Sequence, residues 1–99
     1  MYALSNLNKL AQVGELVPET MAAFKAYDKA ALADGAIPKK YKELMAIAIA
    51  LTTQCPYCIE VHRQQAVDAG VTEMELAEAV HVAAALRAGG AITHGTHLF

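Results

Sequence analysis

The stretch ELMAIAIALTTQCPYCIEVH, residues 43–62, holds both cysteines of the 99-residue chain and predicts two helices joined by a short turn. Residues 38–53 read as one helix, which Pro38 opens. The next helix begins near Cys55 or Pro56 and ends at Gly70, because glycine is a favoured residue just after a helix. We therefore expect an antiparallel helical hairpin that turns near residues 53–55.

The remaining sequence predicts further helices on both sides of this hairpin. A short helix is expected over residues 5–13, and a second begins at Pro18 and ends by Gly35. Its Met21, Phe24 and Tyr27 are expected to face inward.

After the hairpin, Thr72 and Glu75 have the spacing of a capping box, so they predict the start of another helix. Gly89 and Gly90 are expected to break that helix, and a short last helix follows them. No segment alternates polar and apolar residues as a strand does. The fold class is therefore all-α: a compact bundle of five to six helices forming one domain over residues 1–99, with the CxxC motif at the N-terminus of a central helix.

The composition points to a subunit with apolar surface left over after folding. Hydrophobic residues make up 56% of the chain and charged residues only 18%. Such an excess favours a homo-oligomer, above all around the all-apolar run 82–86. The net charge of -2 without a basic cluster argues against nucleic acid as a partner. We see no membrane span and no signal peptide, and we expect the protein in the cytoplasm, where paired cysteines serve catalysis or metal binding more often than structure.

Helical geometry places three reactive side chains close together. Cys55, Cys58 and His62 fall within about 60° of one another on a helical wheel, among Ile and Ala, and so are expected to face apolar packing. A helix N-terminus stabilises a thiolate there, and His62 lies one turn from Cys58 as a potential base. Glu43 is expected within reach of His62 across the hairpin. A Glu43–His62–Cys58 proton relay is thus one hypothesis.

Other interpretations of these residues stay open at this point. Cys55, Cys58 and His62 could be three ligands of a zinc-binding interaction module, although no fourth ligand is evident. The cysteines could also be inert core residues. Glu43 could simply pair with Lys39, four residues earlier on the same helix face.

The sequence also resembles a known family. A Glu, eleven residues, CxxC, three residues and a His match the alkylhydroperoxidase D-like branch of the carboxymuconolactone decarboxylase superfamily. The matching frame includes DGAIPKKYKELMAIAIA before the cysteines and AVDAGVTEMELAEAVHVAAALRAGGAITHG after them. One departure is Tyr57, which stands where peroxidase members often carry a histidine.

The resemblance implies a peroxidase-type oxidoreductase that assembles as a homo-trimer or homo-hexamer. Cys58 would attack the peroxide, Cys55 would close the disulfide, and Glu43 and His62 would relay protons. No metal, flavin or haem is implied; the partners would be a peroxide or disulfide substrate and an unidentified thiol reductant. A decarboxylase-type lyase, which does not depend on the cysteine pair, is the alternative within the same superfamily.

Overall fold

The computed structural model describes residues 2–99, and this part of the chain is helical without any strand. The all-α prediction is therefore confirmed. The elements in chain order are the 3-10 helix η1 (Leu4–Lys9), α1 (Leu10–Leu16), α2 (Pro18–Leu32), α3 (Lys39–Thr53), α4 (Pro56–Asp68), α5 (Glu73–Gly95) and the 3-10 helix η2 (Thr96–Leu98).

The helix boundaries follow from local residue chemistry. Gln54 adopts a left-handed conformation, with φ of 57°, and so ends α3 and turns the chain into α4. Gly70 has φ of 88°, a conformation that costs glycine little, and it follows the end of α4. Thr72 and Glu75 form the capping box that begins α5, each side chain bonding the other residue's backbone N–H.

Two sequence-based expectations were wrong. Gly89 and Gly90 do not break α5, which continues to Gly95. Glycine lowers helix propensity by about 1 kcal/mol but, unlike proline, keeps its N–H, so the flanking helix can carry it. Phe24 and Tyr27 do not face inward either: they are 61% and 75% exposed, because α2 packs only on α1 and one end of α3.

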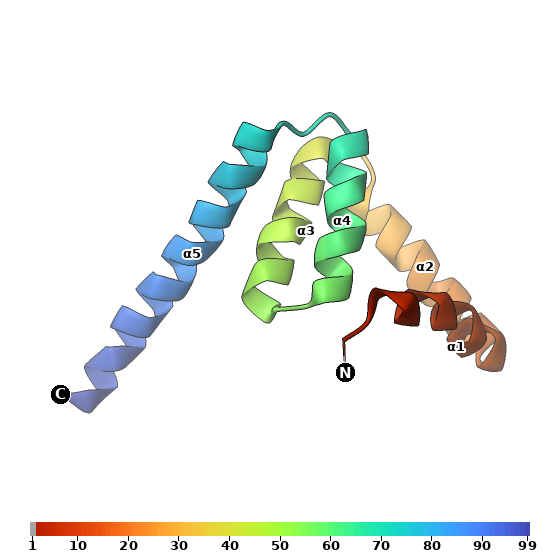
Figure 1. The fold of residues 1–99 in the computed structure, drawn as a ribbon, viewed down its shortest axis with the longest axis horizontal. Coiled ribbons are helices and arrows are strands. Elements are labelled where there is room, and N and C mark those ends of the chain that lie inside the picture. The colour runs from red at the N-terminus through yellow and green to blue at the C-terminus, as the bar shows by residue number, and fades with distance from the viewer. Residues whose placement is uncertain (1) are drawn as a thin grey trace.

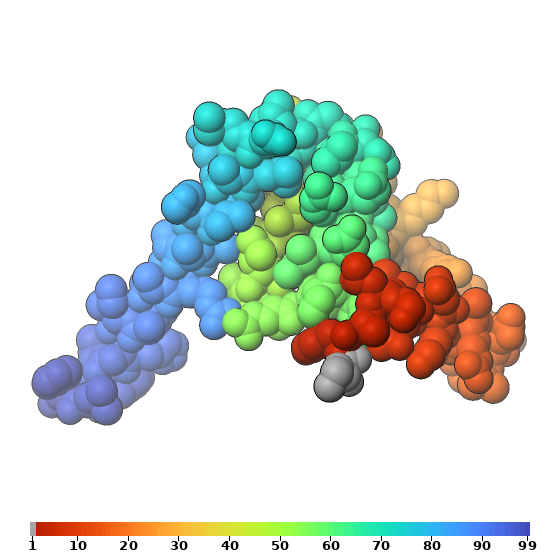
Figure 2. Space-filling model, in the orientation of Figure 1, coloured from red at the N-terminus to blue at the C-terminus, as the bar shows by residue number. Residues whose placement is uncertain are grey.

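The α3–α4 hairpin forms the centre of the molecule, and the other helices diverge from it (Figure 1). α5 packs along α3 on one side, while α2 and α1 extend on the other. The radius of gyration is 16.3 Å, above the roughly 13 Å of a compact chain of this length. The C-terminal half of α5 projects away from the rest of the molecule in the space-filling view (Figure 2).

The buried core is small and lies between α3, α4 and the start of α5. Ile47, Ala66 and Val71 form its centre, and half-buried leucines of α3 and α5 pack against them.

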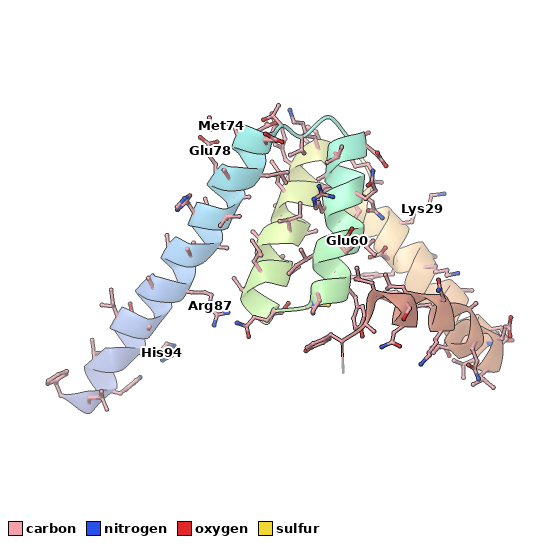
Figure 3. The ribbon with its side chains drawn as sticks, viewed as in Figure 1. Lys29, Glu60, Met74, Glu78, Arg87 and His94 are labelled. Carbon is pink, nitrogen blue, oxygen red and sulfur yellow. The ribbon has the colours of Figure 1, made fainter. Side chains whose placement is uncertain are left out.

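Polar contacts hold α5 against α3 at two points. Lys40 pairs with Glu75 at 3.1 Å, and Arg87, which points from α5 toward the end of α3 (Figure 3), donates to the Thr52 carbonyl at 2.6 Å.

Many large apolar side chains remain at the surface of the single chain. On α5 alone, Val80, Val82, Leu86 and Ile92 are between 47% and 76% exposed. None of the helices within residues 2–99 has both the length and the apolar character that crossing a bilayer requires.

Replacing Ile47 by alanine should destabilise the fold strongly, whereas the same change at Ile49 should not. Ile47 is 5% exposed and Ile49 is 60% exposed on the same helix. We expect Ile47→Ala to lower the free energy of unfolding by about 2–5 kcal/mol, and Ile49→Ala to change it by less than about 0.5 kcal/mol. Urea denaturation followed by circular dichroism measures both, and equal losses would contradict this core.

Candidate active site

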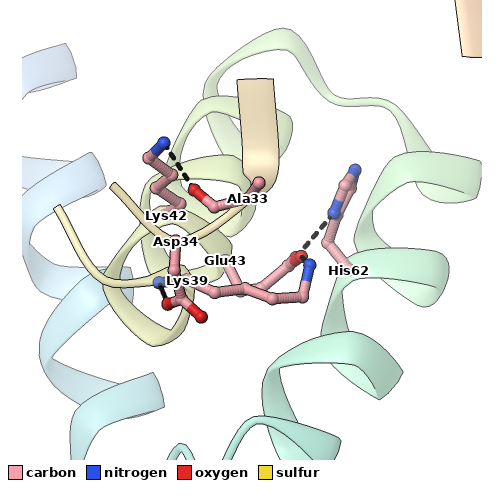
Figure 4. A network of polar contacts seen from close by, with 6 residues as sticks. All are labelled: Ala33, Asp34, Lys39, Lys42, Glu43 and His62. Carbon is pink, nitrogen blue, oxygen red and sulfur yellow. Dashed lines mark hydrogen bonds and ion pairs between the residues drawn. The ribbon is translucent and has the colours of Figure 1, made fainter. Parts of the chain in front are cut away.

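Glu43 is the buried acid at the centre of the candidate site. Its side chain lies in α3, fully buried between α3 and α4, and both carboxylate oxygens are bonded. Oε1 accepts from Lys39 Nζ at 3.1 Å, and Oε2 lies 2.8 Å from His62 Nδ1 on α4 (Figure 4). Burial of a carboxylate without partners is costly, so these two bonds account for its position.

The ion pair with Lys39 and the contact with His62 do not exclude each other, because the Glu43 carboxylate makes both at once.

The bond to Glu43 also orients the imidazole of His62. An ionised carboxylate only accepts hydrogen bonds, so Nδ1 donates, and Nε2 is left as the basic nitrogen. Figure 4 shows this second nitrogen on the side of the ring away from Glu43.

The two cysteines lie at the N-terminus of α4, the same helix that carries His62. Cys55 is the N-cap, and its Sγ accepts from the backbone N–H of Cys58 at 3.3 Å. Both thiols are free; Cys55 is half-buried, whereas Cys58 is exposed. The expectation that all three groups face apolar packing thus fails for Cys58 in the single chain, because its side chain is exposed at an open groove.

The N-terminal geometry makes the two thiols unequal. Interaction with the Cys58 side chain and the bond from the Cys58 N–H together lower the pKa of the Cys55 thiol. Interaction with the Cys55 side chain, partial desolvation and the charge of a Cys55 thiolate all raise the pKa of Cys58. The interaction between the two thiols therefore favours ionisation of Cys55 over ionisation of Cys58.

A groove of about 540 Å³ opens at these thiols. Cys55, Cys58 and His62 all line it, together with apolar side chains that include Phe24 and Val61. Within residues 2–99, no hydrogen bond joins His62 to either sulfur. The groove nevertheless gives a small molecule simultaneous access to the exposed thiol and the imidazole.

The zinc hypothesis required Cys55, Cys58 and His62 to converge on one point. In the part of the chain that the structure describes, no three His, Cys, Asp or Glu side chains are placed to hold a metal ion. The thiols and the imidazole share a groove without forming a ligand set.

Sequence reasoning missed the N-terminal segment as part of the site. Asn6, Leu7 and Leu10 line the same groove, and the Tyr57 hydroxyl accepts from the Asn6 side chain at 3.0 Å. Asn6 and Tyr57 are 51 residues apart in sequence. No helical periodicity or motif links residues at such a distance, so the sequence held no signal for this contact.

Comparison with known proteins extends the match over most of the chain. The model of the carboxymuconolactone decarboxylase family matches residues 18–99. An uncharacterized protein in the cox locus of Paracoccus denitrificans is 49% identical over 72 residues, which cover 73% of this chain and 65% of that protein. An uncharacterized protein of Cupriavidus necator is 35% identical over 80 residues, covering 80% of this chain and 71% of that protein.

Solved structures agree with these relatives. A carboxymuconolactone decarboxylase family protein from Legionella pneumophila has a TM-score of 0.79 at 39% identity, covering 83% of this chain and 73% of that one. A protein from Methanobacterium thermoautotrophicum has a TM-score of 0.80 at 36% identity, covering 86% of this chain and 96% of that one. This chain therefore belongs to the carboxymuconolactone decarboxylase family.

Proposed function

We propose that this protein is a thiol-dependent, peroxidase-type oxidoreductase that cycles between a Cys55/Cys58 dithiol and a disulfide. The observation that carries the proposal is the buried Glu43–His62 pair, whose imidazole lines the same groove as both cysteines. A fixed, partly buried base beside an exposed thiol with a raised pKa suits proton abstraction from that thiol.

The first step makes use of this base. Nε2 of His62 takes the proton of Cys58, and the Cys58 thiolate attacks one oxygen of the peroxide. The O–O bond breaks, the leaving alkoxide or hydroxide takes the proton back from His62, and Cys58 becomes a sulfenic acid. Glu43 orients the imidazole and stabilises its transient positive charge.

The second step makes use of the inequality of the thiols. Cys55, whose sulfur lies against the Cys58 backbone, supplies a thiolate that attacks the sulfur of the Cys58 sulfenic acid. An S–S bond forms as the S–O bond breaks, and the hydroxide leaves as water after protonation. A thiol reductant must then donate two electrons to restore the dithiol, which fits a reducing cytoplasm as the place of action.

A decarboxylase-type lyase is the alternative within the family. Such a reaction does not depend on the cysteine pair, and no feature of the groove favours it over thiol chemistry. The loss or survival of activity without Cys58 separates the two.

Mild oxidation should close a disulfide between Cys55 and Cys58 within one chain. The residues are three apart at the helix N-terminus, and the Cys55 sulfur already contacts the Cys58 backbone. Intact mass should fall by about two hydrogens, without a covalent dimer. Free thiols that persist after stoichiometric peroxide, or one bound zinc per chain, would contradict thiol redox chemistry.

Single-cysteine variants should separate the two sulfur roles. Cys58→Ser should abolish peroxide consumption, because it removes the attacking sulfur. Cys55→Ser should still allow one turnover and leave a sulfenic acid that dimedone traps. Stopped-flow kinetics and mass spectrometry of the adduct measure both. A dimedone adduct in Cys58→Ser, with none in Cys55→Ser, would reverse the roles.

Loss of the base should slow the reaction with peroxide most near neutral pH. We expect His62→Ala to reduce the rate by about 10²–10⁴-fold. The raised pKa of Cys58 keeps that thiol protonated without help at neutral pH, so much of the rate should return at high pH, where the thiolate forms unaided. The rate as a function of pH, measured for wild type and variant, tests this.

Variants of Glu43 and Lys39 distinguish a relay from a structural ion pair. Glu43→Gln should slow the reaction in the same direction as His62→Ala but less. Lys39→Met is the matched control: it removes the ion pair to the buried carboxylate while leaving the Glu43–His62 bond, so it should lower the free energy of unfolding but slow the reaction far less than His62→Ala does. Equal rates for wild type, Glu43→Gln and His62→Ala would rule out the relay.

We also propose that the protein acts as a homo-trimer or homo-hexamer. The exposed apolar side chains of α5 support association, because monomers seldom leave so much apolar surface uncovered. Light scattering at micromolar concentration should give three or six times the 10.5 kDa of one chain. A mass of one chain would refute this assembly.

A further inference from the structure

Tyr57, which lies between the two cysteines, connects the thiol site to the N-terminus of the chain. Its hydroxyl accepts from the Ala3 backbone N–H at 3.3 Å and from the Asn6 side chain at 3.0 Å. The Tyr2 ring lies edge-on to the Tyr57 ring, with centroids 5.8 Å apart. One side chain of α4 thus contacts three residues of the N-terminal segment.

This segment has no buried residue of its own to hold it. Within residues 2–99, η1 packs on α4 and α1. A short helix without a buried face lies at the low end of local stability, so the loss of one or two hydrogen bonds changes its position readily. The segment also precedes residue 18, where the match to the family model begins.

The segment forms one wall of the groove at the thiols. Leu7 and Leu10 line it from the N-terminal side, while Phe24 of α2 and Val61 of α4 line it from the other elements. Leu7 and Leu10 therefore supply two of these four large apolar side chains, and both belong to the segment that donates hydrogen bonds to the Tyr57 hydroxyl. A groove of about 540 Å³ falls within the range of small-molecule sites, roughly 300–1,000 Å³.

We propose that Tyr57 determines specificity by holding residues 3–10 as an apolar wall of the thiol groove, which binds the apolar part of a molecule that reacts at Cys58. The wall raises the reactivity of Cys58 toward apolar reactants relative to small polar ones. This inference rests on Cys58 being the reactive thiol of the proposed function. Tyr57 acts through the segment that it fastens and takes no part in the chemical step.

Paired maleimides test the wall without any peroxide turnover. N-methylmaleimide and N-phenylmaleimide react by the same addition of a thiolate and differ in their apolar part. The rate of adduct formation at Cys58 of the reduced protein, followed by peptide mass spectrometry, gives a phenyl-to-methyl ratio. Glutathione, measured alongside, supplies the intrinsic ratio of the two reagents.

Tyr57→Phe removes only the hydroxyl and keeps the ring. We expect it to lower the phenyl-to-methyl ratio about 2- to 10-fold, the range that corresponds to one or two lost neutral hydrogen bonds. Amide hydrogen exchange over residues 3–10 should become faster in the same variant. Leu7→Ser, which shortens the wall but leaves Tyr57 intact, should lower the ratio as well.

Tyr41→Phe is the matched control, because Tyr41 is an exposed tyrosine of α3 outside this groove. It should change neither the ratio nor the exchange. An unchanged ratio in both Tyr57→Phe and Leu7→Ser would overturn the proposal, as would an equal fall in Tyr41→Phe or unchanged exchange in Tyr57→Phe. A wild-type protein that consumes no peroxide but shows the expected ratios would refute the proposed function and leave the apolar wall standing.

Discussion

The carboxylate of Glu43 is the one charged group that the described fold buries completely, and the central hairpin is arranged around it. Its two oxygens connect Lys39, one turn earlier on α3, with His62 on α4. A buried carboxylate that lost either bond would be left partly unpaired in a region of low polarity. The same carboxylate that joins α3 to α4 therefore also fixes the tautomer of the imidazole.

The N-terminus of α4 is the second feature on which the site depends, because its backbone places the two thiols in different environments. Cys55, as the N-cap, accepts a bond from the Cys58 N–H, and the Cys58 side chain together with this N–H lowers the pKa of the Cys55 thiol. Cys58 is exposed, and interaction with the Cys55 side chain raises the pKa of its thiol. The helix N-terminus therefore acts on Cys55, whose sulfur accepts the Cys58 N–H. His62 of the Glu43–His62 pair lines the groove at which Cys58 is exposed.

The open shape of the single chain bears on how the site is enclosed. The helices diverge from the hairpin (Figure 1), and the N-terminal segment and α2 both line the groove at the thiols. The Tyr57 hydroxyl accepts two hydrogen bonds from that segment, whose helix η1 has no buried residue. The apolar side chains that α5 exposes in the single chain are surface that association with further copies would cover.

The amino-acid sequence alone determined the all-α fold, the α3–α4 hairpin and the proximity of Glu43 to His62. These features depend on helical periodicity and on end signals such as the Thr72 capping box, which act over a few residues. Only the tertiary structure decided the exposure of Phe24, the unbroken course of α5 and the contact between Tyr57 and the N-terminal segment. The physical reason is that burial and long-range contacts depend on where whole helices pack, and local propensity does not encode that.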